Sequence, residues 1–110
     1  MKGTYLGEFE EIVLLAVGIL EGNAYAISIR EEIKDQLNRS VSLSALHTAM
    51  HRLEEKGYLT SSLGEPTKVR GGKRKRLFTL TSTGRAALYT ARDTRERMWR
   101  KLPTISIQKQ

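Results

Sequence analysis

Apolar residues in the first third of the chain recur with a helical period. Between Glu8 and Glu21 the apolar stripe widens until the segment is apolar on nearly every side, which predicts a buried central helix. Gly22 and Asn23 mark its end. A second amphipathic helix is predicted after them, and its apolar face is formed by Ala26, Ile29, Ile33 and Leu37.

A third helix is predicted between Ser42 and Gly57. The Ser42 hydroxyl is placed to accept from the free amides of the first turn, and Gly57 is placed to end the helix in a left-handed conformation. One face is apolar and consists of Leu43, Leu46, Met50 and Leu53. The other face carries hydrogen-bonding side chains, namely Ser44, His47, Thr48, His51, Arg52 and Glu55.

The period changes to two after Gly57, which predicts strands. Tyr58 to Leu63 and Leu77 to Thr81 are the strand-like runs, and the basic, glycine-containing stretch 64–76 between them predicts a hairpin tip. Ser82 is a candidate cap for a last helix that runs to about Leu102. The expected fold is mainly α with a small β-hairpin. It comprises a winged helix-turn-helix domain (1–81), a C-terminal dimerisation helix (82–102) and a tail (103–110) without an assignable pattern.

Charge is divided unevenly along this basic chain, whose formal net charge is +7. Residues 1–67 hold 6 basic and 10 acidic side chains, whereas residues 68–110 hold 13 basic and 2 acidic ones. The basic C-terminal portion is suited to binding a polyanion. Nucleic acid is favoured over an anionic membrane, because no basic amphipathic stretch carries a wide apolar face.

Two absences narrow the function classes. The chain has no cysteine, which excludes disulfides, thiolate nucleophiles and cysteine-based zinc sites. Its longest apolar run, Ile12 to Leu20, is too short to span a membrane, and acidic residues precede it where a secretory signal would be basic. We therefore expect a cytoplasmic protein without a membrane partner.

Two groups of residues are candidates for DNA contact. The third helix would read the bases, and this reading helix would contribute Ser42, Ser44, His47, Thr48, His51 and Arg52. The hairpin tip, or wing, would contribute Lys68, Arg70, Lys73, Arg74, Lys75 and Arg76. Charge runs are often only solvated, but a cluster at a wing position is suited to neutralising phosphates and releasing their counterions.

The sequence gives little support for a catalytic site or a metal-binding site. His47 and His51 have the i, i+4 spacing of zinc ligands, but there is no third histidine and no cysteine, so DNA contact or solvent exposure is favoured. The acidic clusters are explained by solvated helix faces, and the serines lie in no nucleophile motif. We predict no enzyme activity, no cofactor and no metal.

The last helix has a heptad-like seam in which an arginine interrupts the apolar positions. Few apolar residues are available for packing inside the chain, so a dimer interface is favoured over a helix that folds back onto its own domain. The expected interface comprises Leu88, Ala91, Arg95, Met98, Trp99 and Leu102, on a seam that begins at Gly84. Trp99 beside the seam is either an interface anchor or a wall of an aromatic effector site.

Several segments together resemble the PadR family of bacterial transcriptional regulators. They are Leu6 to Glu11, Ala24 to Ala26, Val41 to Leu46, Arg52 to Gly57, and Gly72 to Gly84. The resemblance implies a homodimeric winged-helix repressor that binds a palindromic operator in double-stranded DNA and is released by a small, often aromatic, effector. The short last helix resembles a subgroup some of whose members hold planar drugs between paired tryptophans. His47 stands where the family usually has tyrosine.

The predicted function is sequence-specific transcriptional regulation by binding to DNA. One alternative is a nonspecific nucleic-acid-binding basic protein, which the mixed polar face of the third helix disfavours. Another is a winged-helix protein-interaction module, which the basic C-terminal portion disfavours.

Overall fold

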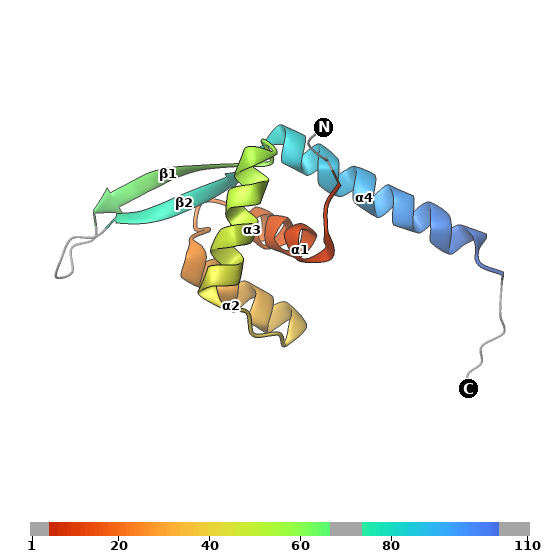
Figure 1. Cartoon of the computed structure of the whole chain (residues 1–110), viewed down its shortest axis with the longest axis horizontal. Helices are drawn as coiled ribbons and strands as arrows, with labels where there is room; N and C mark the ends of the chain where they lie inside the picture. The colour runs from red at the N-terminus through yellow and green to blue at the C-terminus, as the bar shows by residue number, and fades with distance from the viewer. Residues whose placement is uncertain (1–4, 67–73, 104–110) are drawn as a thin grey trace.

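The elements follow the predicted order in the computed structural model, which describes residues 5–66 and 74–103 (Figure 1). The helices are α1 (Glu8–Ile19), α2 (Ala26–Leu37), α3 (Leu43–Glu55) and α4 (Ser82–Lys101). Strands β1 (Leu59–Pro66) and β2 (Arg74–Leu80) pair antiparallel. The predicted winged helix-turn-helix with an added C-terminal helix is confirmed.

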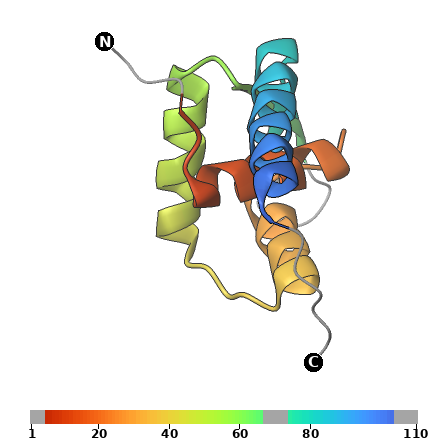
Figure 2. The ribbon, with the colours of Figure 1, turned by 90° about the vertical axis from the view of Figure 1, so that its right-hand side faces the viewer.

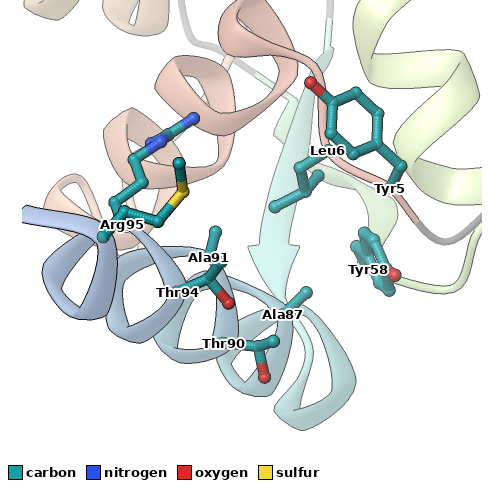
Figure 3. Close-up of a pocket in the computed structure, with 9 residues that line it drawn as sticks. Tyr5, Leu6, Tyr58, Ala87, Thr90, Ala91, Thr94 and Arg95 are labelled. Carbon is teal, nitrogen blue, oxygen red and sulfur yellow. The ribbon is translucent and has the colours of Figure 1, made fainter. Parts of the chain in front are cut away.

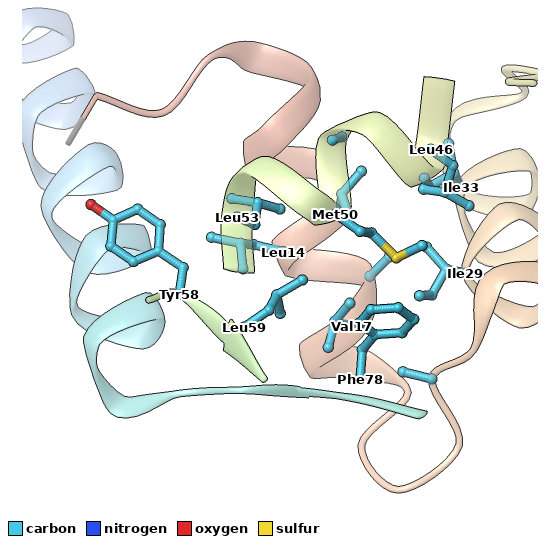
Figure 4. Packing of buried hydrophobic residues seen from close by; sticks show 14 of the residues in the cluster. Leu14, Val17, Ile29, Ile33, Leu46, Met50, Leu53, Tyr58, Leu59 and Phe78 are labelled. Carbon is cyan, nitrogen blue, oxygen red and sulfur yellow. The ribbon is translucent and has the colours of Figure 1, made fainter. Parts of the chain in front are cut away.

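The core lies where α1, α2 and α3 meet the base of the hairpin (Figure 4). Its largest fully buried side chains are Leu14, Ile29, Ile33, Leu46, Met50, Leu53, Leu59, Val13 and Val17. Phe78 of β2 closes the core from the hairpin side, and its amide donates to the Ala24 carbonyl at 2.8 Å. This hydrogen bond joins the base of the hairpin to the chain just before α2, so the hairpin base and the helix-turn-helix form one body.

The two ends of α3 are built as predicted. Ser42 Oγ accepts from the Ala45 amide at 3.1 Å, and Gly57 adopts a positive φ of 80° directly after the last turn. The start of α4 differs by one residue, because Thr81 rather than Ser82 is its cap. Thr81 Oγ1 accepts from the Gly84 amide and donates to the Gly57 carbonyl at 2.7 Å, so it also ties α4 to the end of α3.

Two further expectations need correction. α1 is not buried on all sides: it ends at Ile19, and Leu15 and Ile19 remain 47% and 59% exposed. β2 begins at Arg74 rather than at Leu77, because backbone pairing with β1 continues through an irregular register into the charged residues. Strand pairing in an exposed hairpin does not require apolar alternation, so the pattern places the start of the strand too late.

The last helix leaves the body of the molecule. α4 contacts the other elements as far as Arg95, which bonds Glu11 of α1, and its last turns project away from them (Figure 1). Viewed from that end, α4 points toward the viewer past α1 and α2 (Figure 2).

Candidate nucleic-acid interface

One face of α3 is exposed and polar along its whole length. Leu46, Met50 and Leu53 are buried against the core, which fixes the helix from behind and turns the opposite side chains outward. The predicted reading residues are all exposed, and they are Ser42, Ser44, His47, Thr48, His51 and Arg52. They present hydroxyls, imidazoles and a guanidinium, which donate to or accept from base edges and phosphates.

The two histidines of this face differ in their surroundings. His51 Nε2 lies 3.4 Å from a Glu55 carboxylate oxygen one turn later, whereas His47 has no polar side-chain partner within the described chain. Within residues 5–66 and 74–103 no group of three or more histidine, aspartate or glutamate side chains is placed to hold a metal ion. His47 is therefore the imidazole with both nitrogens available to an external group.

The described part of the wing presents three consecutive cations. Arg74, Lys75 and Arg76 are exposed on β2. The other predicted wing contacts, Lys68, Arg70 and Lys73, lie outside the described residues.

Two of the three cations also have partners within the chain. Lys75 Nζ lies 4.0 Å from the centre of the Tyr25 ring at the start of α2, a cation–π contact. Arg76 donates to Ser61 Oγ at 3.1 Å, and Ser61 Oγ donates to Glu54 of α3 at 2.7 Å. The wing is thus connected by polar contacts to both helices of the helix-turn-helix.

Sequence reasoning missed Tyr25, Ser61 and Glu54. Each looks ordinary in the sequence, because an aromatic residue, a hydroxyl and a solvated acid are common at such positions. Ser61 is paired across the hairpin with Phe78, two residues from Arg76 on the opposite strand, so the cross-strand register was the signal that could have predicted its contact.

Three acids in the first turn of α1 each pair with a different part of the chain. Glu8 lies 3.3 Å from Arg39, Glu10 lies 2.8 Å from Lys56 at the end of α3, and Glu11 bonds Arg95 of α4. The side chains of Glu10 and Glu11 are each only 13% exposed. All three acids were expected to be solvated, and Glu8 is indeed exposed, but Glu10 and Glu11 are not. The three ion pairs connect the loop after α2, the end of α3 and α4 to the first turn of α1, whose positive N-terminal end favours their charge.

The first half of α4 is packed within the chain. A Cβ on Gly84 would lie 2.3 Å from the Tyr58 carbonyl oxygen, so only glycine permits this approach, and Leu88 packs against the core. Arg95, which was expected at a dimer interface, bonds Glu11 of its own chain. Beyond Arg95 the apolar side chains of Met98, Trp99 and Leu102 are 66%, 71% and 57% exposed.

A hollow of about 500 Å³ lies between the N-terminal segment and α4 (Figure 3). Leu6 and Tyr58 line one side, and the α4 side is formed by Ala87, Thr90, Ala91, Thr94, Arg95 and Met98. A shallower hollow of about 260 Å³ adjoins it farther along α4, where Arg95 and Met98 are joined by Trp99 and Leu102. Arg95 and Met98 therefore line both hollows.

In the part of the chain that the structure covers, no helix is long and apolar enough to cross a membrane.

Comparison with known proteins gives one family and a set of similar folds. Residues 14–90 match the family model described as the transcriptional regulator PadR-like family. No curated protein matches the sequence.

Among solved structures, a transcriptional regulator from Clostridium thermocellum is 25% identical, with a TM-score of 0.67 over 83% of this chain and 85% of that chain. A PadR family regulator from Eggerthella lenta is 21% identical, with a TM-score of 0.65 over 84% and 80%. Bacillus subtilis PadR, solved in complex with operator DNA, is 19% identical, with a TM-score of 0.60. The match covers 94% of this chain and 53% of the longer Bacillus protein.

Proposed function

The chain belongs to the PadR-like family of transcriptional regulators, and from this premise we propose that it is a sequence-specific DNA-binding repressor that acts as a homodimer. The observation that carries the proposal is the α3 face. A row of exposed hydrogen-bonding side chains lies on a helix whose other side is buried in the core, and Arg76 of the wing is linked to that helix through Ser61 and Glu54. The structural similarity to Bacillus subtilis PadR, which was solved with operator DNA, also supports the proposal that this chain binds DNA.

In this mechanism α3 enters the major groove, which is wide enough to admit a helix. His47 and Arg52 reach base edges, while the wing cations approach the phosphate backbone. Arg74, which has no side-chain partner within the described residues, is fully available to a phosphate. Lys75 and Arg76 would bind phosphate from positions already defined by Tyr25 and Ser61. We further propose that the chain consists of a DNA-binding domain (1–81), a dimerisation helix (82–102) and a tail (103–110). The proposed location of the protein is the cytoplasm.

The dimer is proposed to form through the exposed end of α4. Met98, Trp99 and Leu102 leave apolar surface in water that a second copy would cover, with Leu88 and Ala91 nearer the body. A two-fold dimer would place both α3 helices on one side of the duplex, with half-sites about one turn, roughly 10 bp, apart on a palindromic operator.

The effector is proposed to bind at Trp99. The indole is exposed and lies beside Arg95 and Met98 in the shallower α4 hollow, where a planar aromatic molecule would stack on the ring. Trp99 is the only tryptophan, so its fluorescence reports the site directly. We expect a planar aromatic ligand to quench this emission and to release operator DNA. The compounds tested should include planar aromatic cations and phenols. If none of them both quenches the Trp99 emission and releases operator DNA, Trp99 is an interface anchor alone.

The DNA-binding proposal is tested by footprinting the DNA upstream of the chain's own gene, followed by competition between the protected palindrome and random duplex. Preference for the palindrome supports the proposal. Equal binding to both duplexes would indicate a nonspecific nucleic-acid-binding protein, and binding to neither would indicate a protein-interaction module.

The wing is tested by the salt dependence of DNA binding. Replacing Lys73, Arg74, Lys75 and Arg76 with alanine should weaken binding to every sequence and reduce the salt slope by about one unit for each lost phosphate contact. A control variant loses the same number of charges outside the wing, outside α3 and outside the end of α4, through Lys2, Arg85, Arg92 and Lys109 to alanine, and should retain the slope. An unchanged slope in the wing variant would contradict its role.

A further inference from the structure

The hairpin extends away from the helices beyond its base (Figure 1). Phe78 is the last buried residue of β2 toward the tip, and the cations Arg74 to Arg76 beyond it are exposed. On β1, residues 61–65 are half-buried or exposed. Apolar burial therefore fixes the base of the hairpin, but it does not hold the described part of the wing against α3.

Two hydrogen bonds in series connect the wing to α3. Arg76 Nη1 donates to Ser61 Oγ at 3.1 Å, and Ser61 Oγ donates to Glu54 Oε2 at 2.7 Å. The hydroxyl thus gives its single donor to the carboxylate and accepts from the guanidinium. Because each of these hydrogen bonds has one charged partner, both are stronger than hydrogen bonds between neutral groups. Ser61 is therefore held from both sides.

The contact with Ser61 leaves Arg76 able to bind DNA. A guanidinium has several N–H groups, and the exposed Arg76 side chain can offer the others to a phosphate. Lys75, the preceding residue, lies over the ring of Tyr25 at the start of α2. Successive side chains of a strand point to opposite faces, so the links to α3 and to α2 leave opposite faces of β2.

The two neighbouring acids at the end of α3 have different partners. Glu55 is 51% exposed, and its carboxylate lies 3.4 Å from His51 Nε2 of the same helix. Glu54 is half-buried, and its carboxylate accepts from Ser61 of the hairpin. The link to the wing therefore belongs to Glu54 and is not a general property of the acidic end of this helix.

We propose that Ser61 and Glu54 are positioning residues, which set the direction of the wing relative to α3 and thereby contribute to sequence specificity. The proposal rests on the DNA-binding function proposed above and names two residues that act on DNA through Arg76. On an operator, base contacts place α3 in one position in the major groove, so the wing gains its phosphate contacts only from a matching direction. A wing that already has this direction loses less conformational freedom on binding.

The same link should matter less on random DNA. Nonspecific binding consists mainly of phosphate neutralisation, and it does not require α3 to take one fixed position. A wing that moves freely would then find phosphates nearly as well as one that is held. Loss of the link should therefore lower the preference for the operator, whereas loss of the wing cations should weaken binding to every sequence.

The first test removes the hydroxyl without changing any charge. Ser61→Ala should weaken binding to the palindrome protected in footprinting by about threefold to tenfold, and binding to a random duplex of equal length by less than about twofold. Fluorescence anisotropy measures both. Ser61→Thr, which keeps a hydroxyl, should restore the preference for the palindrome.

Ser62→Ala is the matched control. Ser62 is the next residue of β1, and its side chain is exposed and makes no hydrogen bond among the described residues. The control should bind both duplexes as the wild type does. An equal loss in Ser61→Ala and Ser62→Ala would contradict the inference.

The second test separates positioning from charge. Glu54→Ala removes the acceptor for Ser61 and also removes a negative charge near the proposed DNA surface. Loss of the charge should tighten binding to the random duplex, whereas loss of positioning should lower the preference for the palindrome by about threefold or more. A role that is only electrostatic would tighten binding to both duplexes by the same factor, and that result would contradict the inference.

The third test observes the wing directly in the free protein. NMR relaxation of the Arg76 Nε–Hε group reports how freely the guanidinium moves. This motion should increase in Ser61→Ala and Glu54→Ala and stay unchanged in Ser62→Ala, with circular dichroism confirming that all three variants are folded. A folded Ser61→Ala variant in which Arg76 moves as in the wild type would show that the hydroxyl does not hold the wing.

The outcomes separate this inference from the proposed function. If the wild type prefers the palindrome and Ser61→Ala keeps the whole preference, the inference is overturned and the proposed sequence-specific binding stands. If the wild type itself binds the palindrome and the random duplex equally, both are overturned.

Discussion

The two exposed helices of this protein, α3 and α4, differ in what fixes them in place. α3 buries Leu46, Ala49, Met50 and Leu53 among its 13 residues, and its outward face is polar. α4 has 20 residues and buries only Gly84, and its far end leaves Met98, Trp99 and Leu102 exposed. Contacts within the chain determine the position of α3, whereas the described residues leave the far end of α4 largely uncovered.

This difference separates stability from association. Apolar contacts of α3 lie within the cooperative core, so their loss should appear in the free energy of unfolding. The end of α4 lies outside that core, so in the proposed dimer the loss of its apolar side chains should appear in subunit affinity. Substitutions in the two helices should therefore be distinguishable by the dependence of unfolding on protein concentration.

The largest expected effect is truncation of the α3 core. Leu46→Ala should lower the free energy of unfolding by about 2 to 5 kcal/mol, because the side chain is fully buried and leaves a cavity. Leu102→Ala, an equal truncation at the end of α4, should change the unfolding of the monomer by less than about 0.5 kcal/mol. Urea unfolding at low protein concentration measures both. Equal losses would remove the distinction between the helices.

The next effect lies where α4 joins the body. Gly84→Ala should destabilise the protein by about 1 to 3 kcal/mol, since the added Cβ would overlap the Tyr58 carbonyl and push against Leu80. Gly7→Ala is the matched control, because no atom lies within 4 Å of a Cβ there. Thermal unfolding compares them. A stable Gly84→Ala variant would show that α4 is not closely seated on the end of α3 and the start of β1.

A third prediction concerns the outward face of α3. His47→Ala or Arg52→Ala should cost about 1 to 3 kcal/mol in binding to the operator and much less on random duplex, because base contacts are specific to sequence. Both side chains are exposed, so the free energy of unfolding should stay nearly unchanged. Fluorescence anisotropy on both duplexes gives the comparison. Equal losses on both would assign these residues to phosphate contact.

The contrast between the helices also shows which features the sequence predicts. Periodicity predicted the order of the elements, and local chemistry predicted the ends of α3 at Ser42 and Gly57, because caps depend on neighbours within a few residues. The buried face of α3 followed from spacing alone. Features determined within one turn or one helix face were thus accessible without the structure.

Contacts between distant parts of the chain were not accessible. Arg95 bonds Glu11 across 84 positions, and no local pattern distinguishes such an arginine from a solvated one. The apolar stripe of α1 indicated burial, but a stripe does not say whether its cover comes from the same chain, and Leu15 and Ile19 remain uncovered. The exposure of the polar side chains on the outward face of α3 was predicted correctly, whereas the polar tether of the wing through Ser61 and Glu54 required the fold.

The smallest expected effect tests the two roles assigned to Ser42, which caps α3 and lies at the edge of its reading face. Ser42→Ala removes the acceptor for the Ala45 amide and should cost about 1 kcal/mol of stability. Ser42→Asp keeps an acceptor and adds a negative charge at the positive end of the helix, so its stability should match that of the wild type. The same carboxylate would face phosphate, so this variant should bind DNA more weakly than Ser42→Ala. Chemical unfolding and anisotropy measured on the two variants should therefore rank them in opposite orders, and the same rank in both would assign Ser42 to the cap alone.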